Sequence, residues 1–200
     1  MSVPKALKHL SKTDPMMKKF IAHAGEVHLD GTDDYFKCLV YNIISQLISS
    51  KAADTVIARL NAYCADLIDP ATLVQIDTET YRTFGIGPQK SGYIRSLAQS
   101  FIDDPDTFVH LHKLEDREVV KRLSSLKGIG KWTAEMFLIF GLGRADVFSP
   151  LDLGLRNAMI RHYNLDPDIS NKDLAKYAER WAPYRSVASK LLWRSLEIKD

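Results

Sequence analysis

The sequence predicts an all-α protein, and two observations carry that prediction. Apolar residues recur every three or four positions through most of the chain, which is the period of a helix with one buried face. Helix-start signals, such as a capping aspartate followed by proline at Asp14-Pro15, open several of these stretches. Strand alternation between hairpin turns is missing from the sequence, apart from a short run at Asp146-Val147-Phe148.

Composition is that of an ordinary globular protein. The chain has 200 residues, 46% hydrophobic and 26% charged, enough to bury a sizeable core in one domain spanning residues 1–200. No apolar run approaches the roughly 18 residues of a membrane helix, and no secretory leader pattern occurs in the opening residues. We therefore expect a monomer with no membrane contact, located in the cytoplasm, or in the nucleus of a eukaryote.

The elements follow from caps and breaks. Asp14 caps one helix, Asp33 or Asp34 caps a second, and Ser49 caps a third. The apolar face of the second helix consists of Phe36, Leu39, Val40, Ile43 and Ile44. Further helices are expected over 90–101, from the capping residue Asp116 to 123, over 132–140, 155–163 and 171–196, with Gly-Ile-Gly breaks at 85–87 and 128–130.

Cysteine and charge place limits on cofactors and partners. Cys38 and Cys64 lie inside apolar helical patterns without metal-type spacing, so we expect buried free thiols. An iron–sulfur cluster needs four ligands, and we expect no cofactor. The net charge of +2 is a weak indication of nucleic acid. The C-terminal stretch is locally basic, which suggests one basic face, with Lys176, Arg180, Arg185, Lys190 and Arg194 against Glu179.

The second Gly-Ile-Gly break is the most informative stretch. Two glycines around Ile129 permit a tight reversal with positive φ and a close approach of the backbone to another chain. Ile129 can fill the space between the two helices. The N–H groups that open the second helix suit a phosphate, and Lys131 adds charge beside them. Taken alone, a Gly-x-Gly between helices is more often only a C-cap and a turn.

The surrounding pattern Leu-x-Gly-Ile-Gly-x-x-Thr-Ala resembles the helix–hairpin–helix motif of DNA-binding proteins, here over about residues 116–140. The resemblance implies that the hairpin holds one DNA backbone without reading sequence. The DNA-contacting residues that it implies are Gly128, Ile129, Gly130, Lys131 and Thr133. It also suggests that the carbonyls of Ser124, Leu126 and Ile129 bind a monovalent cation; no other metal site is expected.

A loop at residues 146–154 follows the hairpin and contains Asp152 at the start of another helix. For an isolated aspartate in this position, the simplest interpretation is an N-cap. The frame Asp-Val-Phe followed by Pro-x-Asp-Leu-Gly, after the hairpin, resembles the helix–hairpin–helix DNA glycosylases, and within them the alkyladenine branch. Two further segments match that branch, Ser45–Ala53 and Ala178–Ala188.

The resemblance implies a compact helical domain with the active site in a cleft between two helical halves. It implies a monofunctional DNA glycosylase of base excision repair that flips alkylated bases such as 3-methyladenine out of double-stranded DNA. Asp152 would be its catalytic residue, because an anion stabilises the oxocarbenium-like charge that develops on the sugar. A cationic base is already a good leaving group, so no strong general acid is needed.

Four more positions follow from the resemblance. Trp132 occupies the position of the Schiff-base lysine of lyase-active relatives, and with Met136 it would form the base pocket. Leu47, after Gln46, resembles the wedge that fills the space left by the flipped nucleotide. Both Trp132 and Leu47 have an alternative interpretation as core residues.

Two other functions remain open at this stage. A non-catalytic DNA-binding module would use the same hairpin, but it would not need the Asp152 frame. A glycosylase with lyase activity is disfavoured because tryptophan at position 132 cannot act as the nucleophile. Base release from alkylated DNA distinguishes the first alternative from an enzyme.

Overall fold

The computed structural model of the protein describes residues 2–196, and this part of the chain is helical with no strand. The predicted all-α class is therefore confirmed, and the run Asp146–Phe148 is an irregular segment instead of a strand. The chain forms two compact units, one made of the residues up to Gly31 together with those from Gly143 onward, the other of Thr32–Leu142. A single domain over 1–200 stays a prediction.

The continuous unit, Thr32–Leu142, is built around one helix that contacts several others. Its elements are α3 (Tyr35–Ser45), α4 (Ser50–Tyr63), α5 (Pro70–Gln75), α6 (Thr78–Phe84), α7 (Pro88–Asp103), α8 (Asp106–Val109), η1 (Leu111–Lys113), α9 (Asp116–Ser124), α10 (Lys131–Met136) and η2 (Phe137–Gly141).

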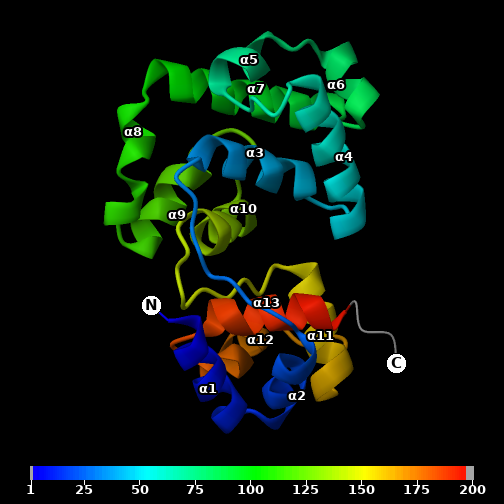
Figure 1. The fold of residues 1–200 in the computed structure, drawn as a ribbon, viewed down its shortest axis with the longest axis vertical. Coiled ribbons are helices and arrows are strands. Elements are labelled where there is room, and N and C mark those ends of the chain that lie inside the picture. Colours follow the sequence, from blue (N-terminus) through cyan, green and yellow to red (C-terminus); the bar gives the residue numbers. More distant parts are fainter. Residues whose placement is uncertain (1, 197–200) are drawn as a thin grey trace. The chain divides into compact units, whose positions relative to one another are not determined.

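Helix α3 is the centre of this unit because its apolar residues cover most of its circumference. It packs against α4, α7, α10 and η2, and Figure 1 shows α4, α7 and α10 around it. Its five predicted core residues are all buried: Phe36, Leu39, Val40, Ile43 and Ile44. The Asp34 side chain accepts a hydrogen bond from Lys37 N–H (2.9 Å), so Asp34 is the cap. The position of α3 fixes the segment that follows it, Gln46–Ser49.

The discontinuous unit joins the two ends of the chain. Its elements are α1 (Val3–Thr13), α2 (Pro15–His23), α11 (Leu153–Tyr163), α12 (Asn171–Ala178), η3 (Glu179–Trp181) and α13 (Arg185–Ser195). Helix α13 packs against α1, α2 and α11, and Figure 1 shows these helices around it. A buried carboxylate ties the two ends together, because Asp14 caps α2 and also accepts hydrogen bonds from Tyr163 Oη (3.0 Å) and Trp181 Nε1 (2.8 Å).

Three predicted elements differ from the structure. The expected helix over 171–196 is three elements, and Pro183 accounts for the break between η3 and α13 because it removes an N–H and disfavours helical backbone before it. The helix predicted from 132 to 140 is α-helical only to Met136 and continues as the wider π-helix η2. Glu115, not Asp116, is the N-cap of α9. None of the described helices is long and apolar enough to cross a membrane.

Candidate functional site

The hairpin between α9 and α10 depends on one glycine with a left-handed backbone. Gly128 has φ +85°, and a Cβ on it would overlap the ring of Tyr93 from α7. Gly130 differs: its φ of −93° and ψ of −179° are ordinary extended values, and a Cβ there meets nothing within 4 Å. The prediction of positive φ is thus confirmed for Gly128 and wrong for Gly130. The missing side chain of Gly130 is therefore not required by packing within the protein; it leaves room for a ligand that approaches the hairpin from outside.

Ile129 closes the hairpin from inside. Its side chain is buried, as predicted, and its N–H donates to the Leu126 carbonyl at 3.2 Å. Gly130 is the N-cap of α10, and it supplies no side-chain cap to the N–H groups of the first turn. Packing thus holds Ile129 inside the hairpin, while Gly130 is exposed at the start of α10.

Gln46 connects the end of α3 to this hairpin. Its Nε2 donates to the Gly128 carbonyl and to Thr133 Oγ1, both at 2.9 Å. Thr133 is buried, so both side chains have bonds within the protein. Whether either residue also contacts DNA stays a prediction.

Leu47 is the most exposed large apolar residue of this unit. Its relative exposure is 103%, which rules out the alternative that it is a core residue. Its φ is +57°, in the left-handed region that leucine rarely adopts. Lys90 Nζ donates to the carbonyls of Ile44 and Gln46, immediately before it, at 2.6 and 2.7 Å. Burial lowers the pKa of the Lys90 ammonium.

These residues meet at one open groove of about 580 Å³ in the continuous unit. The sequence-predicted residues that line it are Gln46, Leu47, Ser124, Leu126, Gly128, Ile129, Gly130 and Thr133. The structure adds Gln89, Lys90 and Tyr93 from α7, which the sequence did not single out. Lys131 does not line the groove; it is exposed and lies 3.7 Å from Glu135 Oε1.

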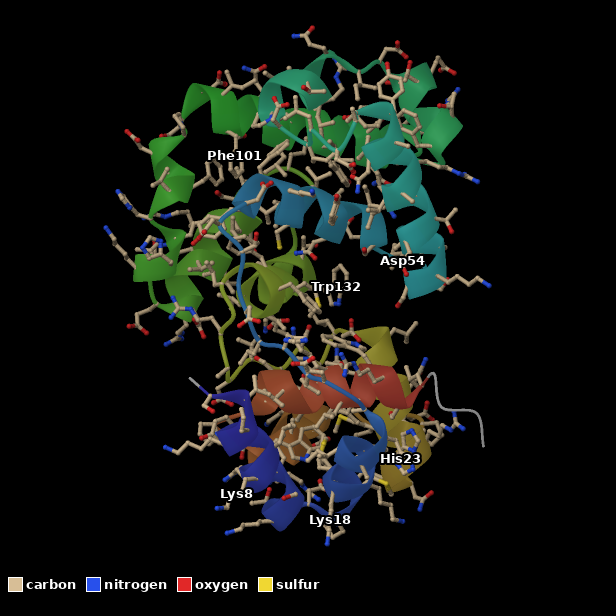
Figure 2. All side chains as sticks on the ribbon, viewed as in Figure 1. Lys8, Lys18, His23, Asp54, Phe101 and Trp132 are labelled. Carbon is tan, nitrogen blue, oxygen red and sulfur yellow. The ribbon has the colours of Figure 1, made fainter. Side chains whose placement is uncertain are left out.

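The two base-pocket candidates lie one turn apart on α10. Trp132 stands on the first turn, where Figure 2 labels it, and is half-buried. Met136 is buried. Residues four apart share one face of a helix, so the two side chains are neighbours along α10. Their role as a base pocket stays a prediction.

Asp152, in the discontinuous unit, is both a helix cap and a positioned carboxylate. It is the N-cap of α11, and only 7% of its surface is exposed. Its Oδ1 accepts hydrogen bonds from Leu155 N–H at 2.8 Å and from Trp193 Nε1 at 2.9 Å. Both donors hold the carboxylate in one rotamer.

Trp193, on α13, was missed by sequence reasoning. A Cβ on Gly154 would lie 3.1 Å from both Asp152 Oδ1 and Trp193 Cδ1. The absence of a side chain at Gly154 therefore lets the indole reach the carboxylate. The only signal in the sequence was the nearby C-terminal match, which stopped at Ala188.

The start of α13 anchors the loop that carries Asp152. Arg185 donates through Nε and Nη2 to the two oxygens of Asp146, at 2.7 and 2.9 Å. Ser186 Oγ accepts from Val147 N–H at 2.9 Å. Burial alone would raise the pKa of Asp146, but the Arg185 hydrogen bonds outweigh it and leave that pKa below 3.8. The Arg185-Ser186 pair thus fixes the path of the chain before Asp152.

Some side chains of the predicted basic face bind groups within the discontinuous unit. Arg185 pairs with Asp146, and Arg194 donates to the carbonyl of Glu26 at 2.6 Å. Burial lowers the pKa of Lys190, so this lysine is not part of a fully solvated basic face. Two of the five basic residues of this stretch, Arg185 and Arg194, therefore bind loop segments of their own unit.

The cysteines carry unreactive thiols. Burial raises the pKa of Cys38 to about 12, and burial likewise raises the pKa of Cys64, which is itself buried. The prediction of buried thiols is confirmed for Cys64, whereas the Cys38 residue is only half-buried. Over residues 2–196, no group of three or more His, Cys, Asp or Glu could hold a metal ion.

An all-helical fold with a helix–hairpin–helix groove and a positioned aspartate defines a class of DNA-binding repair proteins. Residues 40–183 match the HhH-GPD superfamily of base excision DNA repair proteins, and the chain belongs to this family. The predicted family is therefore confirmed.

Two curated relatives and one solved structure extend this match. The chain is 31% identical to DNA-3-methyladenine glycosylase 1 of Schizosaccharomyces pombe, over 100% of this chain and 90% of that protein. It is 30% identical to the DNA-3-methyladenine glycosylase of Saccharomyces cerevisiae, over 94% and 78%. The structure of the S. pombe 3-methyladenine DNA glycosylase in complex with abasic DNA is 28% identical, covers 97% of both chains and has a TM-score of 0.88.

Proposed function

We propose that the protein is a monofunctional DNA glycosylase that removes alkylated bases, such as 3-methyladenine, from double-stranded DNA. The observation that carries this proposal is the doubly hydrogen-bonded Asp152 in a member of this repair family. The names of its relatives, DNA-3-methyladenine glycosylases, agree with it.

The chemistry follows from one fixed carboxylate. As the N-glycosidic bond of a cationic base breaks, the bond's electrons leave with the base and positive charge builds on the deoxyribose. The Asp152 carboxylate, held by Leu155 N–H and Trp193 Nε1, stabilises that charge without reorganising. Water then adds to C1′ of the sugar and loses a proton, so the product is an abasic site and a free base.

The groove of the continuous unit is the proposed DNA contact. The exposed Gly130 of the hairpin and the N–H groups that open α10 would face a phosphate oxygen, and the exposed Leu47 would enter the base stack at the site of the flipped nucleotide. Trp132 and Met136 would contact the extruded base. Contacts of this kind position the protein on DNA of any sequence.

The three carbonyl-bearing residues proposed for a monovalent cation, Ser124, Leu126 and Ile129, line the same groove. Backbone carbonyls are hard oxygen ligands that suit such an ion, although the Leu126 carbonyl also accepts the Ile129 N–H. An ion held there would fix the hairpin backbone and add positive charge beside the phosphate. We further propose that the enzyme acts as a monomer in the compartment that holds the DNA.

The test is base release from DNA treated with a methylating agent. The purified protein is incubated with this DNA, and the released bases are separated and identified. We expect methylated purines to be released from treated DNA and no base from untreated DNA. Tight binding to abasic-analogue DNA without any base release would favour the alternative, a non-catalytic DNA-binding module.

A further inference from the structure

The first Gly-Ile-Gly break has the same backbone geometry as the hairpin. Gly85 has φ +94° and ends α6, as Gly128 with φ +85° precedes α10. Ile86 is buried like Ile129. Gly87 is an extended N-cap of α7 with no side-chain cap, as Gly130 is of α10. The proposed function uses only the second of these two turns.

The first turn lacks a feature that a phosphate site needs. Proline at position 88, the first residue of α7, has no N–H to donate. Instead, the first two turns of α7 face the other hairpin. The Tyr93 ring occupies the space beside Gly128, and Gln89 Nε2 donates to the Tyr93 hydroxyl at 2.8 Å. This turn therefore supports a neighbour within the protein.

Lys90 is the central residue of that support. Its ammonium donates to the Ile44 and Gln46 carbonyls at 2.6 and 2.7 Å, where α3 ends. A cation at a helix C-terminus satisfies carbonyls that have no partner in the helix and faces the negative end of its dipole. The Gln46 carbonyl belongs to the peptide group that joins Gln46 to Leu47. Lys90 thus fixes the plane of the peptide that sets φ of Leu47.

Leu47 needs such a restraint because its backbone is in a conformation that leucine avoids. With φ at +57° and a fully exposed side chain, it gains nothing from packing that would hold it there. The Gln46 side chain restrains the same turn from the hairpin side, through Gly128 and Thr133. The turn is therefore held between α7 and the hairpin.

We propose that Lys90 is a positioning residue that keeps the Gln46–Leu47 turn in the shape required for insertion into DNA. This inference rests on the proposed function, in which Leu47 is the inserted side chain. Lys90 itself contacts neither the base nor the sugar. It acts through the backbone of Leu47, so its loss matters only while the leucine side chain is present.

The test compares four variants with the wild type: Lys90→Met, Lys90→Arg, Leu47→Ala and the double variant Lys90→Met/Leu47→Ala. Lys113→Met is the matched control, because it removes one exposed lysine charge of the same unit. Single-turnover base release is measured on methylated DNA. Insertion is measured separately, by fluorescence of 2-aminopurine opposite a tetrahydrofuran abasic analogue.

Lys90→Met should slow base release by about tenfold or more, because two charge-assisted hydrogen bonds are lost. The 2-aminopurine signal should fall as it does for Leu47→Ala. Arginine at position 90 can donate to both carbonyls and should restore most of the rate and the signal. In the double variant, loss of Lys90 should add little to the loss of Leu47. Lys113→Met should behave as wild type.

The inference is overturned if Lys90→Met keeps the wild-type rate and fluorescence, or if its effect is equally large with and without Leu47. Should Lys90→Met fail to fold by thermal melting, Lys90→Gln, which retains one donor group, replaces it with the same criteria. Failure of the proposed function looks different. In that case the wild type itself releases no methylated base, whereas failure of this inference leaves wild-type release and the Leu47→Ala defect intact.

Discussion

Asp152 shows how one side chain can cap a helix and also be a carboxylate held in a fixed position. Its Oδ1 caps α11 through Leu155 N–H and receives the Trp193 indole N–H. A cap fixes the position of the carboxylate relative to the backbone, and the indole fixes its rotation. The two interpretations that the sequence left open, cap or catalytic residue, are therefore compatible, and only a measurement that separates charge from capping can assign the chemistry.

Asp152→Asn makes that separation. Asn caps helices about as well as Asp, and its Oδ1 can accept the same two hydrogen bonds. We expect the melting temperature to stay near the wild-type value. Base release should fall by roughly 10²-fold or more, because the amide carries no charge to stabilise the oxocarbenium ion. Both quantities are measured on the same purified variant.

Asp77→Asn is the control for this variant. Asp77 caps α6 through Thr80 N–H at 2.8 Å and belongs to the other unit. It should leave base release unchanged, with at most a small fall in melting temperature because Thr80 Oγ1 loses its carboxylate acceptor. Near-normal turnover of Asp152→Asn would mean that Asp152 is only a cap.

Leu47 marks a limit of prediction from sequence at the residue scale. A leucine between two apolar helices is usually core, so sequence could name it as a wedge only through resemblance. The structure decides the question through exposure and backbone strain, and neither is encoded by the residue type. Trp193 shows the same limit, because its contact with Asp152 spans 41 residues of sequence.

At the scale of the element, the hairpin offers a pair of glycine variants that behave differently. Alanine at position 130 has room and an ordinary φ, so Gly130→Ala should fold normally. It places a methyl group on the outer surface, so we expect weaker binding to abasic-analogue duplexes of any sequence. Binding is measured by fluorescence anisotropy at fixed salt, since salt changes all such affinities.

Gly128→Ala is the informative comparison because it disturbs the protein itself. It combines positive φ with a clash against Tyr93, so its melting temperature should fall together with its affinity. A folded Gly130→Ala that binds as tightly as wild type would contradict the assignment of this hairpin to the DNA backbone.

The helices could be predicted from sequence where local sequence signals determine their bounds, and less well where tertiary packing determines them. Helix α3 was predicted with all five core residues because its apolar period is unbroken. The 171–196 segment was predicted as one helix although it contains Pro183, because its apolar pattern continues across the break. The π-helical turns at Phe137–Gly141 leave no local signal.

The ion pair that anchors the loop before Asp152 should make the stability of the protein depend on pH in the acid range. The pKa of Asp146 in the folded protein is below 3.8, so the ion pair with Arg185 stabilises the fold fully above that value. This contribution is lost as the pH falls through the folded pKa. The pair is one-third exposed, which limits its worth to about 1 kcal/mol, or about 2–4 °C in melting temperature.

The check is thermal melting of wild type and Asp146→Asn between about pH 6 and about pH 3. The wild type should melt higher near neutrality, and the difference should narrow below about pH 4, because protonated Asp146 no longer differs in charge from asparagine. A difference that stays constant down to pH 3 would show that the ion pair contributes no pH-dependent stability.

At the scale of the whole molecule, the distribution of charge agrees with DNA binding through main-chain groups more than through basic side chains. The net charge is only +2, and Arg185 and Arg194 of the basic C-terminal stretch bind within the discontinuous unit. The groove is lined instead by the exposed Gly130 and by the exposed, uncharged Leu47. The proposed hairpin contact and the proposed carboxylate belong to different units, so the proposed activity uses residues of both.

The reaction type is a property of the whole chain, because any amine that reached the sugar could act as a nucleophile. Tryptophan at position 132 cannot form a Schiff base, and the hairpin amine of Lys131 lies near Glu135. We therefore expect intact abasic sites as the product, with strand cleavage only after alkali. Incubation with damaged DNA and borohydride should trap no covalent adduct, while a lyase-active glycosylase in the same assay is trapped. Efficient trapping of this protein would make Lys127, Lys131 or another amine a nucleophile, and the monofunctional assignment would be wrong.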